Sequence, residues 1–374
     1  MKFNVSGKAL QTQLSAVSKV INSKNALSIL DNFLLEVKGN TLYITGSDQE
    51  NVVKAEVKIM ESDADGAIAV GARRLLDVMK EVNNQALTFL INDETKEIDI
   101  NFHNGHFNFM GISASEYPRP ASMEPDSITF TLPAKTILNG IENTLFGAST
   151  DTIRPIMTGI FWDIHPNDIT FATTDTHKLV RYIDSNCAPA TETSFCMPPK
   201  PANIIKGIMN KEEEDVIVTL DSKSATFKFS TYTLSCRFIK GTFPPYNRVI
   251  PADNPYCLSV DRVTLLNAMR RMALFASMAS SLVKFNIQQD ELLLSSQDLD
   301  YSTSAEERVA CQYSGNAMTI GFNATYMIEI LSNLKGETVN IELSEPARPG
   351  IFQPEKQLEN ENILMLLMPM QVLE

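Results

Sequence analysis

The pattern of apolar and polar positions repeats three times along the chain. Each repeat opens with a short alternating stretch, at Phe3, Phe130 and Leu258, and continues into apolar residues spaced three and four apart. Alternation predicts a β-strand, and the 3–4 spacing predicts an amphipathic helix. The openings lie 127 and 128 residues apart. A period this long exceeds a solenoid unit, so we expect linked globular domains.

Each repeat then continues with strands and turns, a second helical stretch, and further strands. Turn residues at 39–40, 166–168 and 289–290 predict the hairpins. The predicted helices are 7–24, 72–83, 134–148, 198–211, 261–275 and 323–335. The chain is therefore predicted to be an α+β protein of three similar domains, each with two helices packed on antiparallel sheets. Proline-containing segments at 117–120 and 243–246 predict domains 1–121, 122–250 and 251–374.

Composition narrows the class of protein. Hydrophobic residues make up 44% of the 374 positions, and no apolar run approaches the roughly 18 residues that span a membrane. The first residues lack the pattern of a signal peptide, so we expect a cytoplasmic protein. The five cysteines are odd in number and contain no CxxC pair, which predicts reduced thiols and neither disulfides nor zinc.

The net charge of −13 argues against a nucleic-acid partner until its distribution is considered. The predicted helices hold 14 Lys or Arg against 5 Asp or Glu, so the strands and loops carry the acidic excess. One interpretation is that Lys and Arg simply favour helices; another is that the helices share a basic face toward DNA. The residues expected to face DNA are Lys19, Lys24, Arg73, Arg74, Lys200, Lys206, Arg270 and Arg271.

Domain size constrains how such a face could meet duplex DNA. A domain of this length is roughly 36 Å across, and a closed ring of six such domains leaves a hole of about 36 Å. Rings of three or four leave about 6 and 15 Å, too narrow for a duplex of about 20 Å. Three domains per chain therefore predict a head-to-tail homodimeric ring.

No motif of a catalytic site occurs along the chain. Walker, GxGxxG, HExxH and GxSxG patterns are missing, and the four histidines lack metal-ligand spacing. Asp175 and His177 could form half of a catalytic dyad, but no nucleophile accompanies them. We therefore expect no catalytic residue, metal or cofactor, and the chain is predicted not to be an enzyme. Two alternatives stay open: a monomeric β-rich binding module, and a hydrolase with a dispersed site.

Four segments carry a resemblance to a known family: ATTDTHKLV at 172–180, FPPYNRVIP at 243–251, GFNATYMIEIL at 321–331 and LMPM at 367–370. Together with the three repeats, they make the whole chain resemble the beta subunit of bacterial DNA polymerase III, the sliding clamp. The resemblance implies the DNA clamp fold and a processivity factor that encircles double-stranded DNA without reading its sequence. It also implies partners that bind through short peptide motifs: polymerase subunits, the clamp loader and repair proteins.

The resemblance also implies two sets of site residues. An apolar pocket would receive the partner peptide, with flexible methionines that adapt to varied sequences. Its lining would be Met157, Thr174, His177, Leu179, Pro244, Arg248, Val249, Tyr326, Met368, Pro369 and Met370. The dimer interface would use Phe107, Phe109, Leu274 and Phe275. This chain departs from the family at Thr176-His177-Lys178, where Gly-His-Arg is frequent, and at Ser280, where Phe is common.

Overall fold

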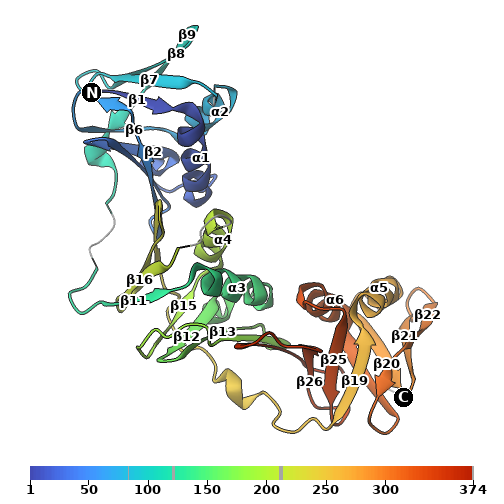
Figure 1. Ribbon diagram of the computed structural model, residues 1–374. Helices are drawn as coiled ribbons and strands as arrows, with labels where there is room; N and C mark the ends of the chain where they lie inside the picture. Colours follow the sequence, from blue (N-terminus) through green and yellow to red (C-terminus); the bar gives the residue numbers. More distant parts are fainter. Residues whose placement is uncertain (83, 120–122, 210–213, 373–374) are drawn as a thin grey trace. The chain divides into compact units, whose positions relative to one another are not determined.

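The computed structural model describes residues 1–82, 84–119, 123–209 and 214–372. Each of the six predicted helices is present there (Figure 1). They are α1 (Gly7–Val17), α2 (Ala72–Glu81), α3 (Ala134–Thr144), α4 (Pro199–Ile208), α5 (Arg262–Ala273) and α6 (Ala324–Asn333). The chain folds into two compact units: unit 1 comprises 1–138 and 197–238, and unit 2 comprises 139–196 and 239–374. The predicted boundary between 121 and 122 lies outside the described residues.

Three helices begin directly at the end of a strand because a polar residue caps them. The side chain of Ser6 accepts a hydrogen bond from Ala9 N, and that of Asp261 accepts one from Thr264 N. Asn323 accepts from the backbone N–H groups of residues 325 and 326. These side chains satisfy donors that the first helical turn leaves unpaired. At these three positions, in the first and third repeats, the change from strand to helix is therefore encoded locally.

Unit 1 contains two antiparallel sheets. The first, sheet A, has the order β5-β1-β7-β8-β9. Its strands are β1 (Lys2–Ser6), β5 (Glu61–Ser62), β7 (Ala86–Ile91), β8 (Glu97–Phe102) and β9 (Gly105–Met110). The second, sheet B, has the order β10-β6-β2-β3-β4-β18-β17-β16-β11. Its strands are β2 (Asn32–Lys38), β3 (Thr41–Ser47), β4 (Asn51–Lys58), β6 (Gly66–Gly71), β10 (Ile112–Ser113), β11 (Ile128–Leu132), β16 (Val216–Leu220), β17 (Ser224–Lys228) and β18 (Tyr232–Arg237).

Unit 2 also contains two antiparallel sheets. Sheet C has the order β15-β12-β13-β14-β27-β26-β25-β19-β23, and sheet D has the order β22-β21-β20-β24. The strands of sheet C are β12 (Ile160–His165), β13 (Asp168–Thr174), β14 (Lys178–Asp184), β15 (Thr193–Met197), β19 (Tyr256–Asp261), β23 (Gln312–Tyr313), β25 (Thr338–Leu343), β26 (Gly350–Pro354) and β27 (Glu361–Leu367). Those of sheet D are β20 (Leu282–Ile287), β21 (Glu291–Asp298), β22 (Thr303–Ala310) and β24 (Met318–Asn323).

A large core of unit 2 lies between sheets and helices. Buried residues of α5 and α6, such as Met269 and Met327, pack with inward-facing residues of β20, β21, β24 and β25. In the orange and red part of Figure 1, α5 and α6 lie next to each other, and the two helices are in contact. Alternating burial along β21 and β25 shows that only one face of each strand enters this core.

The predicted hairpin at Gly39-Asn40 is confirmed. Lys38 pairs with Thr41, so residues 39 and 40 form a two-residue connection, and Gly39 has φ +56°. A glycine adopts this left-handed conformation without the steric cost that a side chain would bring. The predicted helix 7–24 is wrong at its end. α1 stops at Val17, a 3-10 turn covers Ser18–Val20, and Lys24 lies in the following loop.

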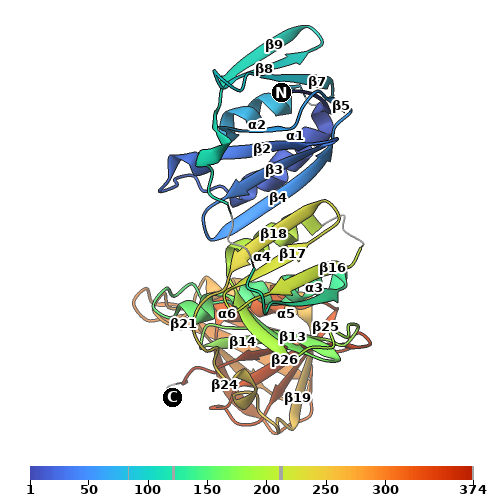
Figure 2. The same cartoon turned by 90° about the vertical axis from the view of Figure 1, so that its left-hand side faces the viewer.

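Each nine-stranded sheet joins strands that are far apart in the sequence. In sheet B, β4 pairs with β18 from Asn51↔Cys236 to Ala55↔Tyr232, and we call this pairing the first junction. In sheet C, β14 pairs with β27 from Lys178↔Leu367 to Asp184↔Glu361, and we call this the second junction. Figure 2 shows β4 beside β18 in one unit and β14 near β26 in the other. A hairpin turn stands at one end of each junction: 48–50 before β4, and 175–177 before β14.

Candidate functional site

The turn between β13 and β14 carries part of the predicted peptide-binding set. Asp175 organises it: its Oδ1 accepts hydrogen bonds from the backbone N–H groups of His177 at 2.9 Å and Lys178 at 2.8 Å. The hydroxyl of Thr174 donates to the Lys178 carbonyl at 2.8 Å. Thr176, at the tip, has φ +79°. A β-branched residue is rarely found in this region, so the surrounding hydrogen bonds hold the turn in a strained conformation.

Lys178 is a buried cation next to this turn. Its side chain is 5% exposed, and its Nζ lies 2.6 Å from Asp175 Oδ2 and 2.9 Å from Glu329 Oε2 of α6. The same ammonium stands 4.6 Å from the ring centre of Tyr326. Burial lowers the pKa of Lys178, but the hydrogen bonds to the two carboxylates outweigh burial and raise it overall. The lysine is therefore charged, and both carboxylates compensate it.

Three residues of the predicted peptide site meet around this cation. The ring of His177 stacks on Tyr326 at 5.4 Å between centroids and 17° between planes. The backbone N–H of Met368 donates to the His177 carbonyl at 2.8 Å, one residue beyond the end of β27. His177 and Met368 are exposed and Tyr326 is half-buried, so this group forms a surface and not a core.

The other predicted lining residues lie around a second group of apolar side chains. Leu179 belongs to a core cluster with Phe243, Tyr246 and Leu366. It is only 2% exposed, so it supports the surface from below and offers little area to a ligand. Pro244, Arg248 and Val249 are close in sequence to the two cluster aromatics, and Met157 follows Ile156, which packs against the cluster. Val249 is 55% exposed and Arg248 is also exposed, so both are accessible.

The structure adds a cavity that sequence reasoning missed. It has a volume of about 660 Å3 and shares Pro369 and Met370 with the predicted set. The other lining residues are Lys284, Thr319, Ile320, Gly321, Pro346, Ala347, Gln371 and Val372. Met370 N donates to the Gly321 carbonyl at 2.8 Å, which fixes the last part of the chain along β24. No local motif marks this cavity, because four separate segments form it.

Two of the lysines expected to face DNA take part in contacts within unit 1. Lys200 Nζ, at the start of α4, donates to Asp48 Oδ2 at 2.5 Å, Val20 O at 2.6 Å and Asn22 Oδ1 at 2.6 Å. Lys19 Nζ donates to the Gly207 carbonyl at 3.1 Å. A side chain at position 207 would meet this ammonium, so the flexible Lys19 side chain would have to move. Both lysines therefore connect α4 to the segment after α1, and Lys200 is only partly available to a phosphate.

The remaining basic residues differ in their pairing. Arg271 forms a two-point contact with Glu307 of β22, in which Nε donates to Oε2 at 2.8 Å and Nη2 to Oε1 at 2.5 Å. Within the described parts of the chain, Arg73, Arg74 and Arg270 form no ion pair. Lys24 is exposed in the loop after α1. Lys24, Arg73 and Arg74 in unit 1 and Arg270 in unit 2 thus keep an accessible charge.

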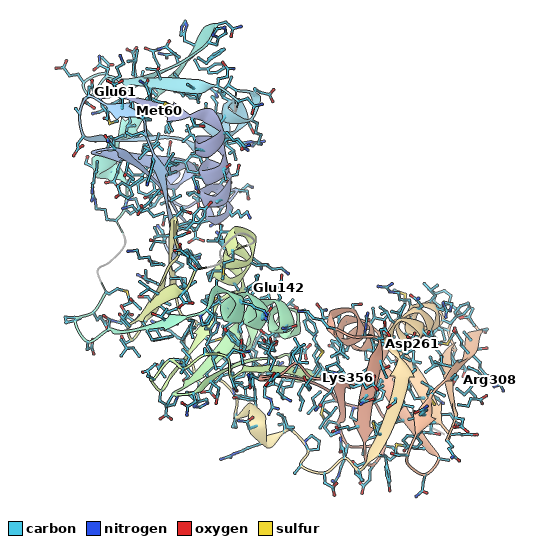
Figure 3. All side chains as sticks on the ribbon, in the orientation of Figure 1. Met60, Glu61, Glu142, Asp261, Arg308 and Lys356 are labelled. Carbon is cyan, nitrogen blue, oxygen red and sulfur yellow. The ribbon has the colours of Figure 1, made fainter. Side chains whose placement is uncertain are left out.

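Two of the predicted interface residues lie on an edge strand of unit 1, and the other two lie at the end of a helix in unit 2. β9 is the last strand of sheet A and β22 is the last strand of sheet D. On β9, Phe107 is half-buried and stacks on Phe102 at 4.8 Å, while Phe109 is 8% exposed. Next to β22, Leu274 is 81% and Phe275 is 38% exposed at the end of α5. Arg308, labelled in Figure 3, lies on β22.

Cysteine and metal chemistry find no support among the described residues. The five cysteines are free thiols, and burial raises the pKa of Cys187, Cys196 and Cys236 to about 12. A thiol with such a pKa is a poor nucleophile at neutral pH. In 1–82, 84–119, 123–209 and 214–372, no group of three or more His, Cys, Asp or Glu could hold a metal ion. No helix in these ranges has the length and hydropathy needed to cross a membrane.

Comparison with known proteins decides the family. Three models of the DNA polymerase III beta subunit match successive parts of the chain: the N-terminal domain at 1–121, the central domain at 131–245 and the C-terminal domain at 247–371. The chain belongs to the DNA polymerase III beta-subunit family.

Relatives in this family match along their full length. The chain is 26% identical to the beta sliding clamp of Pseudomonas putida over 100% of both chains, and 25% identical to that of Staphylococcus aureus over 99% of both. In structure, it is similar to a Pseudomonas aeruginosa sliding clamp bound to griselimycin, with a TM-score of 0.93 at 22% identity, and each chain covers 100% of the other. A Thermotoga maritima beta subunit gives 0.89 at 23% identity, also with full coverage.

Membership of the beta-subunit family confirms three predictions. The fold is α+β with three domains of the clamp type, the chain is a DNA sliding clamp, and it is a non-catalytic accessory subunit of replication. Asp175 and His177, considered above as half of a dyad, have structural roles: one caps a turn and the other stacks on Tyr326. The roles of the individual site residues stay predictions, and they are taken up next.

Proposed function

We propose that two copies of this clamp close head to tail into a ring around duplex DNA. The ring would tether polymerase subunits, the clamp loader and repair proteins through short peptides bound at unit 2, and would act in the cytoplasm. The domains of each copy would be 1–121, 122–250 and 251–374. One observation carries the ring: each unit has a long strand at the edge of its smaller sheet, β9 in unit 1 and β22 in unit 2.

An open edge with apolar neighbours is suited to pairing with another chain. β9 has six residues and β22 has eight, and most of their side chains are exposed or half-buried. Exposed apolar residues accompany both edges: Met110 on β9, and Leu274, Leu299 and Tyr301 near β22. Leu299 and Tyr301, 77% and 71% exposed, were not anticipated from the sequence and extend the proposed interface. Phe109 would support it from inside the protomer.

The predicted DNA-facing residues support a surface that slides. Arg73, Arg74 and Arg270 lie on helices α2 and α5 and project long, flexible charges. Arg271, Lys19 and Lys200 are already engaged within the protein, so their contribution to phosphate binding would be reduced. A few accessible cations give weak, sequence-independent contacts that salt screens. The ring closure, and not the contacts, would then hold the clamp on DNA.

The peptide site would consist of the surface around His177, Tyr326 and Met368, the segment with Arg248 and Val249, and the cavity beside Pro369. At about 25 cal/mol per Å2, burial of about 300 Å2 of apolar area gives about 7 kcal/mol before ordering costs. Those costs leave an affinity on the order of micromolar. Arg248 would face a polar or acidic group of the peptide, since its charge is exposed at the rim.

A retention experiment tests encirclement. The clamp is loaded on nicked circular DNA by a clamp loader, washed in ~0.5 M salt to suppress phosphate contacts, and the circle is then cut once. We expect the clamp to stay on the circle and to leave after the cut, because a ring slides off an open end. Equal loss from the circular and the cut DNA would contradict encirclement.

The matched control is the double variant Phe107→Asp, Leu274→Asp. Placing carboxylates in an apolar interface costs several kcal/mol, so the variant should sediment as a folded monomer and should not be retained on the circle. A variant that still sediments as a dimer would show that the interface lies elsewhere. Because both residues lie outside the peptide site, peptide binding in this variant should equal that of the wild-type clamp.

A further inference from the structure

Lys178 occupies a position where a charge is expensive unless the protein compensates it. The side chain is 5% exposed, and Asp175 and Glu329 both contact its ammonium. Asp175 belongs to the β13–β14 turn, whereas Glu329 belongs to α6, which is about 150 residues further along the chain. One ammonium therefore ties a hairpin turn to a helix from a different repeat.

The β13–β14 turn and α6, which the Lys178 ammonium connects, each carry a residue of the proposed peptide surface. On the turn, His177 lies between Asp175 and Lys178. The Asp175 carboxylate accepts hydrogen bonds from the backbone N–H of His177 and from the Lys178 ammonium. On α6, Tyr326 lies one helical turn before Glu329, and its ring faces the same ammonium at 4.6 Å. The rings of His177 and Tyr326 are stacked above this tie. Met368 joins them through its bond to the His177 carbonyl.

The first junction shows that this kind of tie recurs in the chain. There, Asp48 caps the turn before β4 in the same way, and Lys200 of α4 contacts its Oδ2. In both junctions, a lysine thus binds the second oxygen of the aspartate that organises the turn. Only at the second junction does the lysine also contact an aromatic ring of the proposed binding surface.

We infer that Lys178 is a positioning residue for the partner-peptide site, holding His177 against Tyr326 through its contacts with Asp175 and Glu329. This inference rests on the proposed function of that surface. Lys178 is too buried to contact a peptide itself, so it acts through its neighbours. Without the ammonium, two carboxylates face each other with no cation between them. Their repulsion would move the turn away from α6 and separate the two stacked rings.

The test compares Lys178→Met, Lys178→Arg and Glu329→Gln in the full-length clamp. The probe is the peptide acetyl-Gln-Leu-Asp-Leu-Phe-amide, whose affinity is measured by calorimetry. We expect Lys178→Met to weaken peptide binding about tenfold or more and Glu329→Gln to weaken it less. The affinity of Lys178→Arg should stay within about threefold of the wild type, because arginine keeps the charge. Lys335→Met is the matched control: it removes an exposed lysine two residues after α6 and should leave the affinity unchanged.

A second measurement separates positioning from general destabilisation. The chain has four histidines, so the ring signals of His177 can be assigned by NMR with one histidine substitution. The stacked Tyr326 ring should shift the His177 ring protons upfield in the free wild-type clamp, and this shift should be lost in Lys178→Met and reduced in Glu329→Gln. Sedimentation should show dimers in all variants.

The outcomes distinguish the inference from the proposed function. Wild-type affinity and a wild-type His177 shift in both Lys178→Met and Glu329→Gln would overturn the positioning role. If Lys178→Met fails to fold, Glu329→Gln decides alone. Because the Glu329 side chain is 41% exposed, we expect this variant to keep its fold. A wild-type clamp that binds no peptide would instead overturn the peptide-binding function, whatever the variants do.

Discussion

The turn before β4 in unit 1 and the turn before β14 in unit 2 have the same internal hydrogen bonds but different surroundings. Ser47 and Thr174 each accept at their side-chain oxygen from the backbone two residues later, at 3.1 and 3.2 Å. Asp48 and Asp175 each accept hydrogen bonds from the backbone N–H groups of the second and third residues after them. The residues after these aspartates, Gln49 and Thr176, have φ +82° and +79°. The same turn has thus been kept in two repeats.

The two turns differ in the segments that contact them. At the first turn, the Lys200 side chain of α4 contacts Asp48, and its other contacts are with Val20 and Asn22 after α1. Beside the second turn, the last residues of the chain continue past β27, bond to His177 and reach Gly321. The first junction therefore only connects strands, whereas the second also lies beside the proposed peptide surface. The comparison teaches that the same turn has different neighbours when a further segment of the chain covers it.

Deletion of residues 368–374 should have the largest effect on this difference. It removes Met368, Pro369 and Met370 and opens the cavity, while β27 and its pairing with β14 stay intact. We expect peptide affinity to fall at least about 100-fold, or about 3 kcal/mol, measured by calorimetry. The dimer should persist, because the proposed interface uses other surfaces. Unchanged peptide binding would mean that the partner site lies elsewhere.

Substitution of the two turn aspartates should separate the junctions. Asp48→Ala and Asp175→Ala each remove a largely buried acceptor of several hydrogen bonds, so each should lower the free energy of unfolding by about 2–3 kcal/mol in urea titrations. Only Asp175→Ala should also weaken peptide binding, since only its turn carries His177. A loss of peptide affinity in Asp48→Ala would break the comparison.

Relief of backbone strain should have the smallest effect. Thr176→Gly places at φ +79° a residue that adopts this conformation readily. The gain is partly offset by the greater freedom of glycine in the unfolded chain. We expect the free energy of unfolding to rise by about 0.5–1 kcal/mol, measured by the urea midpoint. Gln49→Gly should raise the free energy of unfolding by a similar amount at the first junction. If both glycine variants were less stable than the wild type, the side chains of Thr176 and Gln49 would contribute contacts that outweigh the strain.

Much of the fold could be predicted from local patterns. The three repeats, the presence of the six helices and the hairpin at 39–40 follow from periodicity and turn residues, which act over a few positions. Prediction failed at the end of α1, where the apolar spacing continues through Val20 and Ile21 although the backbone leaves the helix after Val17. Helix ends depend on which carbonyls the next segment satisfies, and periodicity does not report this.

By itself, the sequence determined the repeat, the clamp family and the segments proposed to carry the peptide surface, because these are encoded in contiguous residues. Only the tertiary structure decided which charges are available and which apolar residues are exposed. Lys200 and Arg271 lie on helices like Arg73, yet their acceptors come from other elements: Asp48 from the turn before β4 and Glu307 from β22. Leu179 became core, and Lys178 became a buried contact of Glu329, because β14 pairs with β27, whose residues lie 177 to 189 positions further along the chain. Contacts over such distances depend on the packed fold, which no local pattern specifies.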